Sequence, residues 1–402
     1  MSAQPESDTL KVDGIRLSAV ASGVRYTDRM DLVLIEIPKD ASVVGAFTQN
    51  AFCAAPVQIA RQHLLANTPR YFLINTGNAN AGTGEAGLVD ALRCCQSMAD
   101  IARVQPDQIL PFSTGVIGEP LPVEPILLGI PDAFSGLDER NWFDAATGIM
   151  TTDTQPKLAS KAIKISGREV AIGGIAKGAG MIKPNMATML AFVFTDLGID
   201  QSDLDGLLQQ SVSQSFNRIT VDGDTSTNDA CMLVATGQSH NYSSLEAAER
   251  ATFQRALTDV FRELAMAIIK DAEGGTKFVT VRVENGLDEQ ECLAVAYTIA
   301  ESPLVKTAMY AADPNWGRIL AAVGRAGVRD FDLSALTIYL GDVCLVVAGE
   351  LAPDYTEARG QAQMDEDEIS IRVDLGRGSH AETVWTSDLS LDYVRINADY
   401  RT

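Results

Sequence analysis

A short and mostly apolar stretch, Thr188–Asp196, begins shortly after a glycine-rich loop that ends at Asn185. This pattern predicts a buried strand. Helical patterns interleave with other strand patterns along the chain, and the mixture favours packed α+β layers over a simple parallel βαβ series. The other clear segments are expected strands at Asp31–Pro38 and Arg70–Gly77, and expected helices at Leu88–Val104, Leu204–Phe216 and Leu245–Asp271.

The C-terminal part of the chain is rich in strand patterns. Alternating or continuous β-branched runs occur as KFVTVRVENG, EISIRVDLG and AETVWTS. A further run, ALTIYLGDVCLVVAGE, has turn residues at Gly341 and Asp342 and predicts a hairpin there. We therefore expect a smaller, strand-rich α/β subdomain at about 280–402.

The charge balance excludes some classes of partner. Acidic residues outnumber basic ones by 53 to 32, giving a net charge of −21. This excess argues against binding of nucleic acid or of an anionic membrane through bulk charge. The apolar runs are too short to span a bilayer. No targeting pattern is seen at the N-terminus and no CxxC pair among the six cysteines, so we expect a cytoplasmic protein with reduced thiols.

Histidine is scarce in this chain. His63, His240 and His380 are the only three, and none lies in an HxxxH or HExxH pattern. We therefore expect no metal site. A Ser-His-Asp triad is also disfavoured, so a nucleophile would need a base other than histidine.

A GxGxxG pattern at Gly82, Gly84 and Gly87 lies between an expected strand and an expected helix. It superficially matches a dinucleotide-binding fingerprint. However, the turn is longer than a Rossmann turn, and no second strand ending in an acidic residue follows the helix. We favour a turn whose glycines let backbone segments approach closely.

A second polar motif, VDGDTSTND, covers Val221–Asp229. It lacks the ligand spacing, the glycine and the distant glutamate of an EF-hand loop, so we reject calcium binding. Two interpretations remain open, a hydrogen-bonded polar loop and a segment that packs near an active site.

The loop before the apolar strand carries Lys177 and Lys183 but no Walker A sequence. By spacing alone, a loop-to-strand junction without chemistry explains this segment equally well. A threonine at the start of a buried strand nevertheless suits an N-terminal nucleophile. Its hydroxyl attacks the preceding carbonyl, the backbone breaks, and the freed α-amine, with a pKa of about 8, serves as the base. Such an enzyme needs no histidine.

A set of motifs carries a resemblance to a known family. They run in order along the chain as NTGNANAGTG, PFSTGVIGE, TTDT, KGAGMIKPNMATML, VDGDTSTND, DAEGGTK, DPNWGRI and YVRINADYRT. Together they resemble the glutamate N-acetyltransferase, or ornithine acetyltransferase, family of arginine biosynthesis. The resemblance extends from Asn75 to Thr402 and is far more specific than any single motif.

The resemblance implies a fold and a reaction. The fold would be a layered α/β sandwich of the self-processing aminopeptidase and ornithine acetyltransferase type. The chain would cleave itself between Ala187 and Thr188, giving an α chain, 1–187, and a β chain, 188–402. Thr188 would carry an acetyl group from N-acetylornithine to glutamate. No cofactor or metal is implied, acetyl-CoA is an additional donor in some members, and the assembly would be a heterotetramer of two α and two β chains.

The resemblance also implies roles for individual residues. Thr114 and Gly115 match the oxyanion hole, where a hydroxyl and a backbone N–H stabilise the tetrahedral intermediate. Substrate-binding positions are matched by Thr151, Lys177, Thr188, Glu273, Asn397 and Thr402. A lysine can pair with the substrate carboxylate, and a glutamate or the terminal carboxylate can pair with its side-chain ammonium. These two pairings are hypotheses.

Three alternatives remain open at this point. The first is a self-processing aminopeptidase or amidohydrolase, in which water replaces glutamate as acceptor. The second is a binding or scaffolding protein, in which Thr188 is merely the first residue of a strand and the chain stays uncleaved. The third is a dinucleotide-dependent enzyme that uses Gly82–Gly87.

Overall fold

The structure is a computed structural model that describes residues 11–183 and 189–399. The chain forms two compact units. The N-terminal unit consists of Met1–Gly178, Pro184–Asn217 and Thr225–Ile268. The C-terminal unit consists of Ala179–Lys183, Arg218–Asp224 and Ile269–Thr402. Each unit therefore contains segments from both sides of the predicted cleavage point, Ala187–Thr188.

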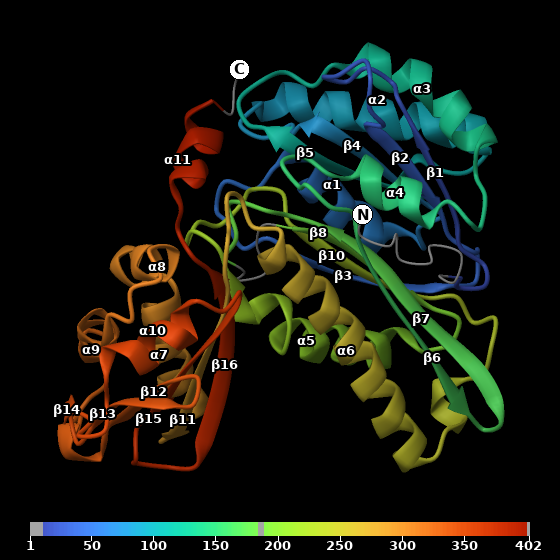
Figure 1. Cartoon of the computed structure of the whole chain (residues 1–402). Coiled ribbons are helices and arrows are strands. Elements are labelled where there is room, and N and C mark those ends of the chain that lie inside the picture. Colours follow the sequence, from blue (N-terminus) through green and yellow to red (C-terminus); the bar gives the residue numbers. More distant parts are fainter. Residues whose placement is uncertain (1–10, 184–188, 400–402) are drawn as a thin grey trace. The chain divides into compact units, whose positions relative to one another are not determined.

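The N-terminal unit contains a four-stranded and a five-stranded sheet (Figure 1). The four-stranded sheet has the order β1-β2-β4-β5, with β4 and β5 parallel and the other pairs antiparallel. Its strands are β1 (Arg16–Val20), β2 (Leu32–Glu36), β4 (Tyr71–Asn78) and β5 (Ile109–Val116). The five-stranded sheet has the order β3-β10-β8-β7-β6. Its strands are β3 (Ser42–Phe47), β6 (Lys157–Ile165), β7 (Arg168–Lys177), β8 (Leu190–Thr195) and β10 (Ala230–Ala235).

The two sheets pack face to face over an aromatic core. Phe72 and Phe112 of the first sheet contact Phe192 of the second, with ring centroids 5.1–5.6 Å apart. Side chains alternate along each strand, so β2 turns Val33 into this core and the next residue, Leu34, to the opposite face. The sandwich is therefore closed by hydrophobic burial on both faces of its sheets.

Helices cover the outer faces of the sandwich (Figure 1). Two helices, α2 and α3, pack on the four-stranded sheet through Cys95, Met98 and Ile126. Helices α5 and α6 lie on the side of the five-stranded sheet. The helices of this unit are α1 (Ala55–Ala66), α2 (Gly84–Ala102), α3 (Val123–Ser135), α4 (Trp142–Gly148), α5 (Gln201–Ser213) and α6 (Ala247–Lys270), whose last turn enters the C-terminal unit.

The C-terminal unit is built on a seven-stranded mixed sheet of order β14-β13-β12-β15-β11-β16-β9. Its strands are β9 (Ile219–Thr220), β11 (Phe278–Gly286), β12 (Thr337–Leu340), β13 (Val343–Val347), β14 (Glu350–Leu351), β15 (Glu368–Asp374) and β16 (His380–Ser387). Its helices are α7 (Glu289–Ala300), α8 (Pro303–Tyr310), α9 (Trp316–Gly324), α10 (Glu357–Met364) and α11 (Leu391–Ala398). The valines of β11 bury one face of the sheet against α7, α8, α9 and α10.

The expected α+β class is confirmed, and so is the hairpin at Gly341, where Leu340 pairs with Val343. The strand-rich unit begins at Ile269 and takes in two earlier segments, so it is larger than the subdomain expected at about 280–402. Arg218–Asp224 joins it because β9 adds to the edge of its sheet beside β16. Ala179–Lys183 is held to that segment by a hydrogen bond of 2.8 Å from the Val221 N–H to the carbonyl oxygen of Ile182. The division into α and β chains stays a prediction.

Candidate active site

The two residues matched to the oxyanion hole lie at the end of β5, beside the end of β7. Thr114 is buried, and its hydroxyl oxygen accepts a hydrogen bond of 3.3 Å from the Lys177 ammonium. Because this oxygen already accepts from lysine, its own proton is left to donate to a developing oxyanion. The nearby positive charge would add to the stabilisation of that oxyanion. The structure therefore brings Thr114 and Lys177 into direct contact.

Gly115 occupies a position that excludes a side chain. Its φ is +136°, and a Cβ there would lie 2.3 Å from the backbone carbonyl carbon of Gly77 and 2.5 Å from the nitrogen of Asn78. The register between β4 and β5 shifts at this point. Glycine is required because both the dihedral angle and the close approach of the two strands forbid other residues.

Asn228 supports this part of β5 from a distant segment. Its side-chain amide donates to the carbonyl oxygens of Ala79, at 2.6 Å, and Ser113, at 2.9 Å. Ser113 in turn donates to Asn75 at 2.6 Å. Asn228 of VDGDTSTND is thus part of a hydrogen-bonded segment that lies beside Thr114, which the resemblance matches to the oxyanion hole. The sequence motif named this residue but did not reveal what it holds.

Asp153, which lies in the TTDT motif but was given no role from the sequence, connects two predicted binding positions. It is buried, and its carboxylate accepts from the backbone N–H of Thr151 at 3.0 Å and of Gly178 at 2.7 Å. It also forms a buried ion pair with Lys157 at 2.6 Å. Asp153 thus holds the backbone of Thr151 close to that of Gly178, the residue after Lys177.

The electrostatic environment keeps Asp153 ionised. Burial by itself would raise its pKa, but the charges of Lys177 and Lys157, with the hydrogen bonds from Lys157 and Gly178, lower the pKa to about 2. Opposite charges and N–H donors favour the carboxylate form. The local arrangement is therefore one carboxylate shared by two lysines.

Asp229 lies just before β10, beside the residue that follows Thr188. Its fully buried carboxyl group accepts hydrogen bonds from the backbone of Met189 and from Ser226. Its Oδ2 has no hydrogen-bond partner among the described residues. Burial raises the pKa of Asp229 well above 3.8, although the charge of Lys177 acts in the opposite direction. A buried acid therefore lies next to the start of β8.

In the C-terminal unit, Glu273 and Asn397 are in direct contact. The Asn397 amide donates to Glu273 Oε2 at 2.8 Å, and the Glu273 N–H donates to the carbonyl oxygen of Ala179 at 2.9 Å. Gly180 has no side chain, and a Cβ there would lie 2.4 Å from the Glu273 carboxyl group. Glycine at this position therefore leaves the space that the Glu273 carboxylate occupies.

The structure thus places six of the predicted residues in two groups. Thr114, Gly115, Thr151 and Lys177 belong to the N-terminal unit, while Glu273 and Asn397 belong to the C-terminal unit. The other three predicted residues, Ala187, Thr188 and Thr402, lie outside the described residues.

Of the three glycines of GxGxxG, Gly87 is the one whose surroundings leave no room for a side chain. The strand that a dinucleotide fold would require is present as β5, parallel to β4, but it ends in Thr114, Gly115 and Val116 and not in an acid. A Cβ on Gly87 would lie 1.9 Å from the hydroxyl of Thr83. Gly82 and Gly84 have positive φ values, as the expected turn requires, but the close approach is at Gly87 and involves the side chains of Thr83 and Asn80.

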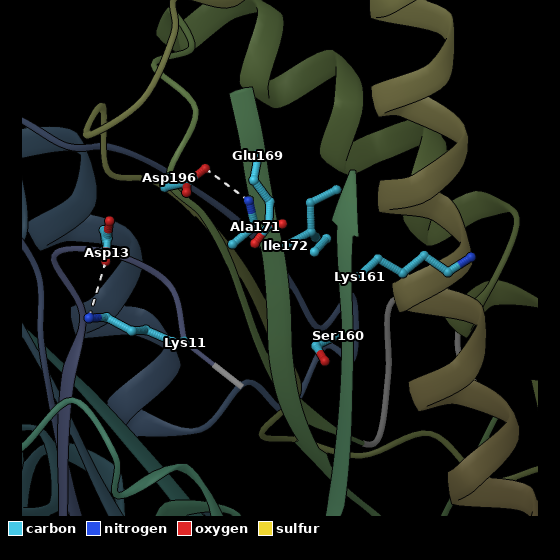
Figure 2. Close-up of a pocket in the computed structure, with 9 residues that line it drawn as sticks. Lys11, Asp13, Ser160, Lys161, Glu169, Ala171, Ile172 and Asp196 are labelled. Atoms are coloured by element: carbon cyan, nitrogen blue, oxygen red, sulfur yellow. Dashed lines mark hydrogen bonds and ion pairs between the residues drawn. The ribbon is translucent and has the colours of Figure 1, made fainter. Parts of the chain in front are cut away.

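A cavity of about 290 Å³ lies elsewhere in the N-terminal unit and contains none of the predicted residues (Figure 2). Its lining is strongly charged and includes Lys11, Asp13, Glu169 and Asp196. Asp196 is largely buried, and its Oδ1 accepts from the backbone N–H of Ala171 at 3.1 Å. Burial raises the pKa of Asp196 to about 6.

Replacing this acid by its amide should stabilise the protein at alkaline pH. Because folding raises the pKa of Asp196, the neutral carboxyl group stabilises the folded protein fully below pH 3.8. This stabilisation is lost as the pH rises through about 6. Asp196→Asn keeps the acceptor for Ala171 and removes the buried charge. After allowance for solvent screening, we expect a gain of about 1–2 kcal/mol at pH 8 and none near pH 4. Thermal unfolding at both pH values measures it. An equal gain at both, or a gain in the exposed control Asp205→Asn, would contradict this assignment.

Two further features concern metals and membranes. Within the two described ranges, no three histidine, cysteine, aspartate or glutamate side chains are grouped so that they could hold a metal ion. No helix in the described part of the chain combines the length and the apolar character needed to cross a bilayer. Absence of a metal and of a cofactor stays a prediction.

Comparison with known proteins decides the family. The ArgJ family model matches residues 16–402, which is nearly the whole chain. The chain belongs to the ArgJ family. The resemblance seen in the sequence motifs is thereby confirmed, and with it the expected class, an acyltransferase of arginine biosynthesis.

Individual ArgJ relatives agree with this assignment. The chain is 53% identical over 394 residues to "Arginine biosynthesis bifunctional protein ArgJ" of Pseudomonas syringae, covering 97% of each chain. It is 52% identical to the protein of the same name in Methylococcus capsulatus, with both chains fully covered. A crystal structure of the Bacillus halodurans ArgJ is 39% identical, with a TM-score of 0.50. That match covers 99% of the solved chain but 52% of this one.

Proposed function

We propose that this chain transfers an acetyl group from N-acetylornithine to glutamate through an acetyl ester on Thr188. The observation that carries the proposal is the contact between Lys177 and Thr114 beside Gly115, because it forms an anion-stabilising group without histidine or metal. Lys177 pairs with Leu190 across the strands, so this group lies near the start of β8. Membership of the ArgJ family supports the proposal.

The nucleophile would be generated by self-cleavage. The Thr188 hydroxyl attacks the carbonyl carbon of Ala187, and the acyl group moves from nitrogen to oxygen. Water then hydrolyses this ester, which leaves a carboxylate on Ala187 and a free α-amine on Thr188. That α-amine, with a pKa of about 8, can accept the hydroxyl proton near neutral pH.

The first half-reaction forms the acetyl-enzyme. The Thr188 oxygen attacks the acetamide carbon of the donor while the α-amine takes the hydroxyl proton. Negative charge develops on the acetamide oxygen, and the Thr114 hydroxyl and Gly115 N–H donate to it. The C–N bond then breaks, and the proton on the α-amine passes to the departing ornithine nitrogen.

The second half-reaction reverses these steps with another amine. The amino group of glutamate attacks the ester carbon, the Thr188 oxygen leaves with a proton, and N-acetylglutamate forms. One amide is exchanged for another, so the reaction needs no cofactor to drive it. We also propose acetyl-CoA as a second donor, which the word "bifunctional" in the names of the relatives supports.

The charged groups of N-acetylornithine suggest how it is held. We propose that Lys177 pairs with the α-carboxylate and Glu273 with the side-chain ammonium. The Glu273 carboxylate is preset by Asn397, which limits its motion before substrate arrives. The remaining positions, Thr151 and Thr402, are assigned to binding by the family resemblance.

The mature protein would consist of α and β chains that stay associated, and we propose two copies of each. The solved Bacillus halodurans chain supports cleavage, since it aligns almost end to end while covering only 52% of this chain. The β chain proposed here, 188–402, is likewise just over half of the 402 residues.

Steady-state kinetics test the proposed reaction. With acetyl-labelled N-acetylornithine varied at several fixed glutamate concentrations, we expect the label in N-acetylglutamate and parallel double-reciprocal lines. Parallel lines report an acetyl-enzyme formed before glutamate binds. Labelled acetate as the sole product would show a hydrolase, and intersecting lines would show direct transfer without an acetyl ester.

A further inference from the structure

A buried lysine in the C-terminal unit has no role in the proposed chemistry. Lys306 lies on α8 and is 2% exposed. Its ammonium donates to the hydroxyl of Thr386 at 2.8 Å and to the carbonyl oxygen of Ser387. A fully buried lysine is costly unless it is paired and hydrogen-bonded, so its presence needs an explanation.

The charges of three carboxylates act on this ammonium. Burial lowers the pKa of Lys306 to about 8, while the charges of Asp388, Asp222 and Glu301 act to raise it. One oxygen of Glu301 is buried without a hydrogen-bond partner among the described residues. Lys306 therefore compensates an acidic cluster that would otherwise repel itself.

The first of these carboxylates holds the segment that follows Glu273. Asp388 accepts from the N–H and the hydroxyl of Thr276, both at 2.7 Å, and from the N–H of Lys277 at 2.9 Å. Asp388 directly follows Ser387, whose carbonyl group binds Lys306. Asp388 thus anchors the chain at Thr276, three residues after Glu273, and Lys306 binds the residue that precedes Asp388.

The second carboxylate holds the helix that carries Asn397. Asp222 accepts from the hydroxyl of Tyr393 at 3.1 Å and from the N–H of Met181 at 2.6 Å. Tyr393 lies one turn before Asn397 on α11, and its carbonyl oxygen accepts from the Asn397 amide at 3.0 Å. The third carboxylate, Glu301, pairs with Lys183 at 2.9 Å.

We propose that Lys306 is a positioning residue that sets the substrate affinity of Glu273 and Asn397 by holding Asp388 and Asp222 in place. The inference rests on the proposed function, in which those two residues bind N-acetylornithine. When the ammonium is lost, the buried Asp388 and the half-buried Asp222 lose a compensating positive charge, and their hydrogen bonds to Thr276 and Tyr393 loosen. Substrate then binds more weakly, while the chemistry at Thr188 is retained.

The proposal predicts a pH-dependent KM. The titratable and charged groups that face Lys306 are Asp222, Glu301 and Asp388, and two of them are engaged by Tyr393 and Lys183. Burial raises the pKa of Tyr393, so its phenol stays neutral in this range. A lysine with a pKa near 8 loses its proton between pH 7 and pH 9. The KM for N-acetylornithine should therefore rise over that interval, about tenfold.

Three mature enzymes test the proposal, each with KM and kcat for N-acetylornithine measured from pH 7 to 9. The wild type should show the rise in KM. Lys306→Arg stays charged, so its KM should remain flat across the interval. Lys306→Met should show a KM raised about tenfold already at pH 7, flat above it, with kcat within about threefold. Any titration of N-acetylornithine affects all three enzymes equally, so a difference between their KM profiles reports residue 306.

A surface lysine provides the matched control. Lys270→Met removes an exposed lysine that pairs with Glu368 and should leave the wild-type profile unchanged. If Lys306→Met fails to fold, the KM profile of Lys306→Arg between pH 7 and pH 9 still tests the proposal. A wild-type KM that stays constant, or an arginine variant that shows the same rise, would overturn the proposal while acetyl transfer stands. Absence of acetyl transfer in the wild type would overturn the proposed function and the inference with it.

Discussion

Replacing Gly115 by alanine is expected to lower kcat about 100- to 1000-fold. The new Cβ would meet the backbone of Gly77 and Asn78 at 2.3–2.7 Å, and the φ of +136° is one that alanine rarely adopts. Backbone atoms cannot yield as a flexible side chain does, so β5 must shift. The shift moves the Gly115 N–H away from the oxyanion, and loss of one such donor typically costs this factor in rate.

A neighbouring glycine separates this effect from general strain. Gly118 also has a positive φ, +85°, but a Cβ there would have nothing within 4 Å. Gly118→Ala should therefore retain kcat within about tenfold, at a small cost in stability. Equal losses in the two variants, measured with saturating N-acetylornithine and glutamate, would remove Gly115 from the oxyanion hole.

Replacing Asp153 by asparagine should produce the largest loss of stability. The substitution keeps the size of the side chain but leaves Lys157, which is 2% exposed, and Lys177, which is 8% exposed, without their shared carboxylate. Breaking a buried ion pair on one side strands a charge, and we expect the free energy of unfolding to fall by about 3 kcal/mol. Thermal unfolding of the uncleaved or mature protein measures the change.

The pH dependence of this loss follows from the direction of the pKa shift. The pKa of Asp153 is lowered from 3.8 to about 2, so its stabilisation is complete above 3.8 and is lost as the pH falls through about 2. The deficit of Asp153→Asn should therefore be constant between pH 5 and pH 8. A deficit that disappears within this interval would contradict the assignment.

A surface aspartate is the control for burial. The pKa of Asp138 is also lowered to about 2, through its hydrogen bonds to Arg140, but this ion pair is exposed to solvent. Water screens exposed pairs, so Asp138→Asn should leave the melting temperature almost unchanged. A comparable loss at both positions would show that hydrogen bonding, and not burial, stabilises Asp153.

The local elements of this fold could be predicted because short-range patterns determine them. The apolar run at Thr188–Asp196 became β8, the stripe at Leu245–Asp271 became α6, and Gly341 turns the expected hairpin. The helix expected from Leu88 begins earlier, at Gly84. Glycines conceal that start in the sequence, because they favour turns, whereas packing of the first turn against Asn80 and Thr83 stabilises it in the structure.

The supports of the site could not be predicted because they join distant segments. Asp153 reaches Gly178, 25 residues later, and Asn228 reaches back 115 residues to Ser113. Neither residue differs in local sequence from a polar loop residue on the surface. Their roles follow from which strands become neighbours, and that is decided by the hydrophobic core between the sheets. The family resemblance named candidate reacting groups, which stay predictions, but it did not name the residues that hold them.

In the proposed reaction, Thr188 becomes an N-terminal nucleophile that carries the acetyl group. A denaturing intact-mass spectrum of the purified protein, pulsed with N-acetylornithine and no acceptor, tests this step. We predict two chains, 1–187 and 188–402, the second partly heavier by one acetyl group that glutamate then removes. A single unmodified chain of 402 residues, or an acetyl group located on any residue other than Thr188, would contradict the account.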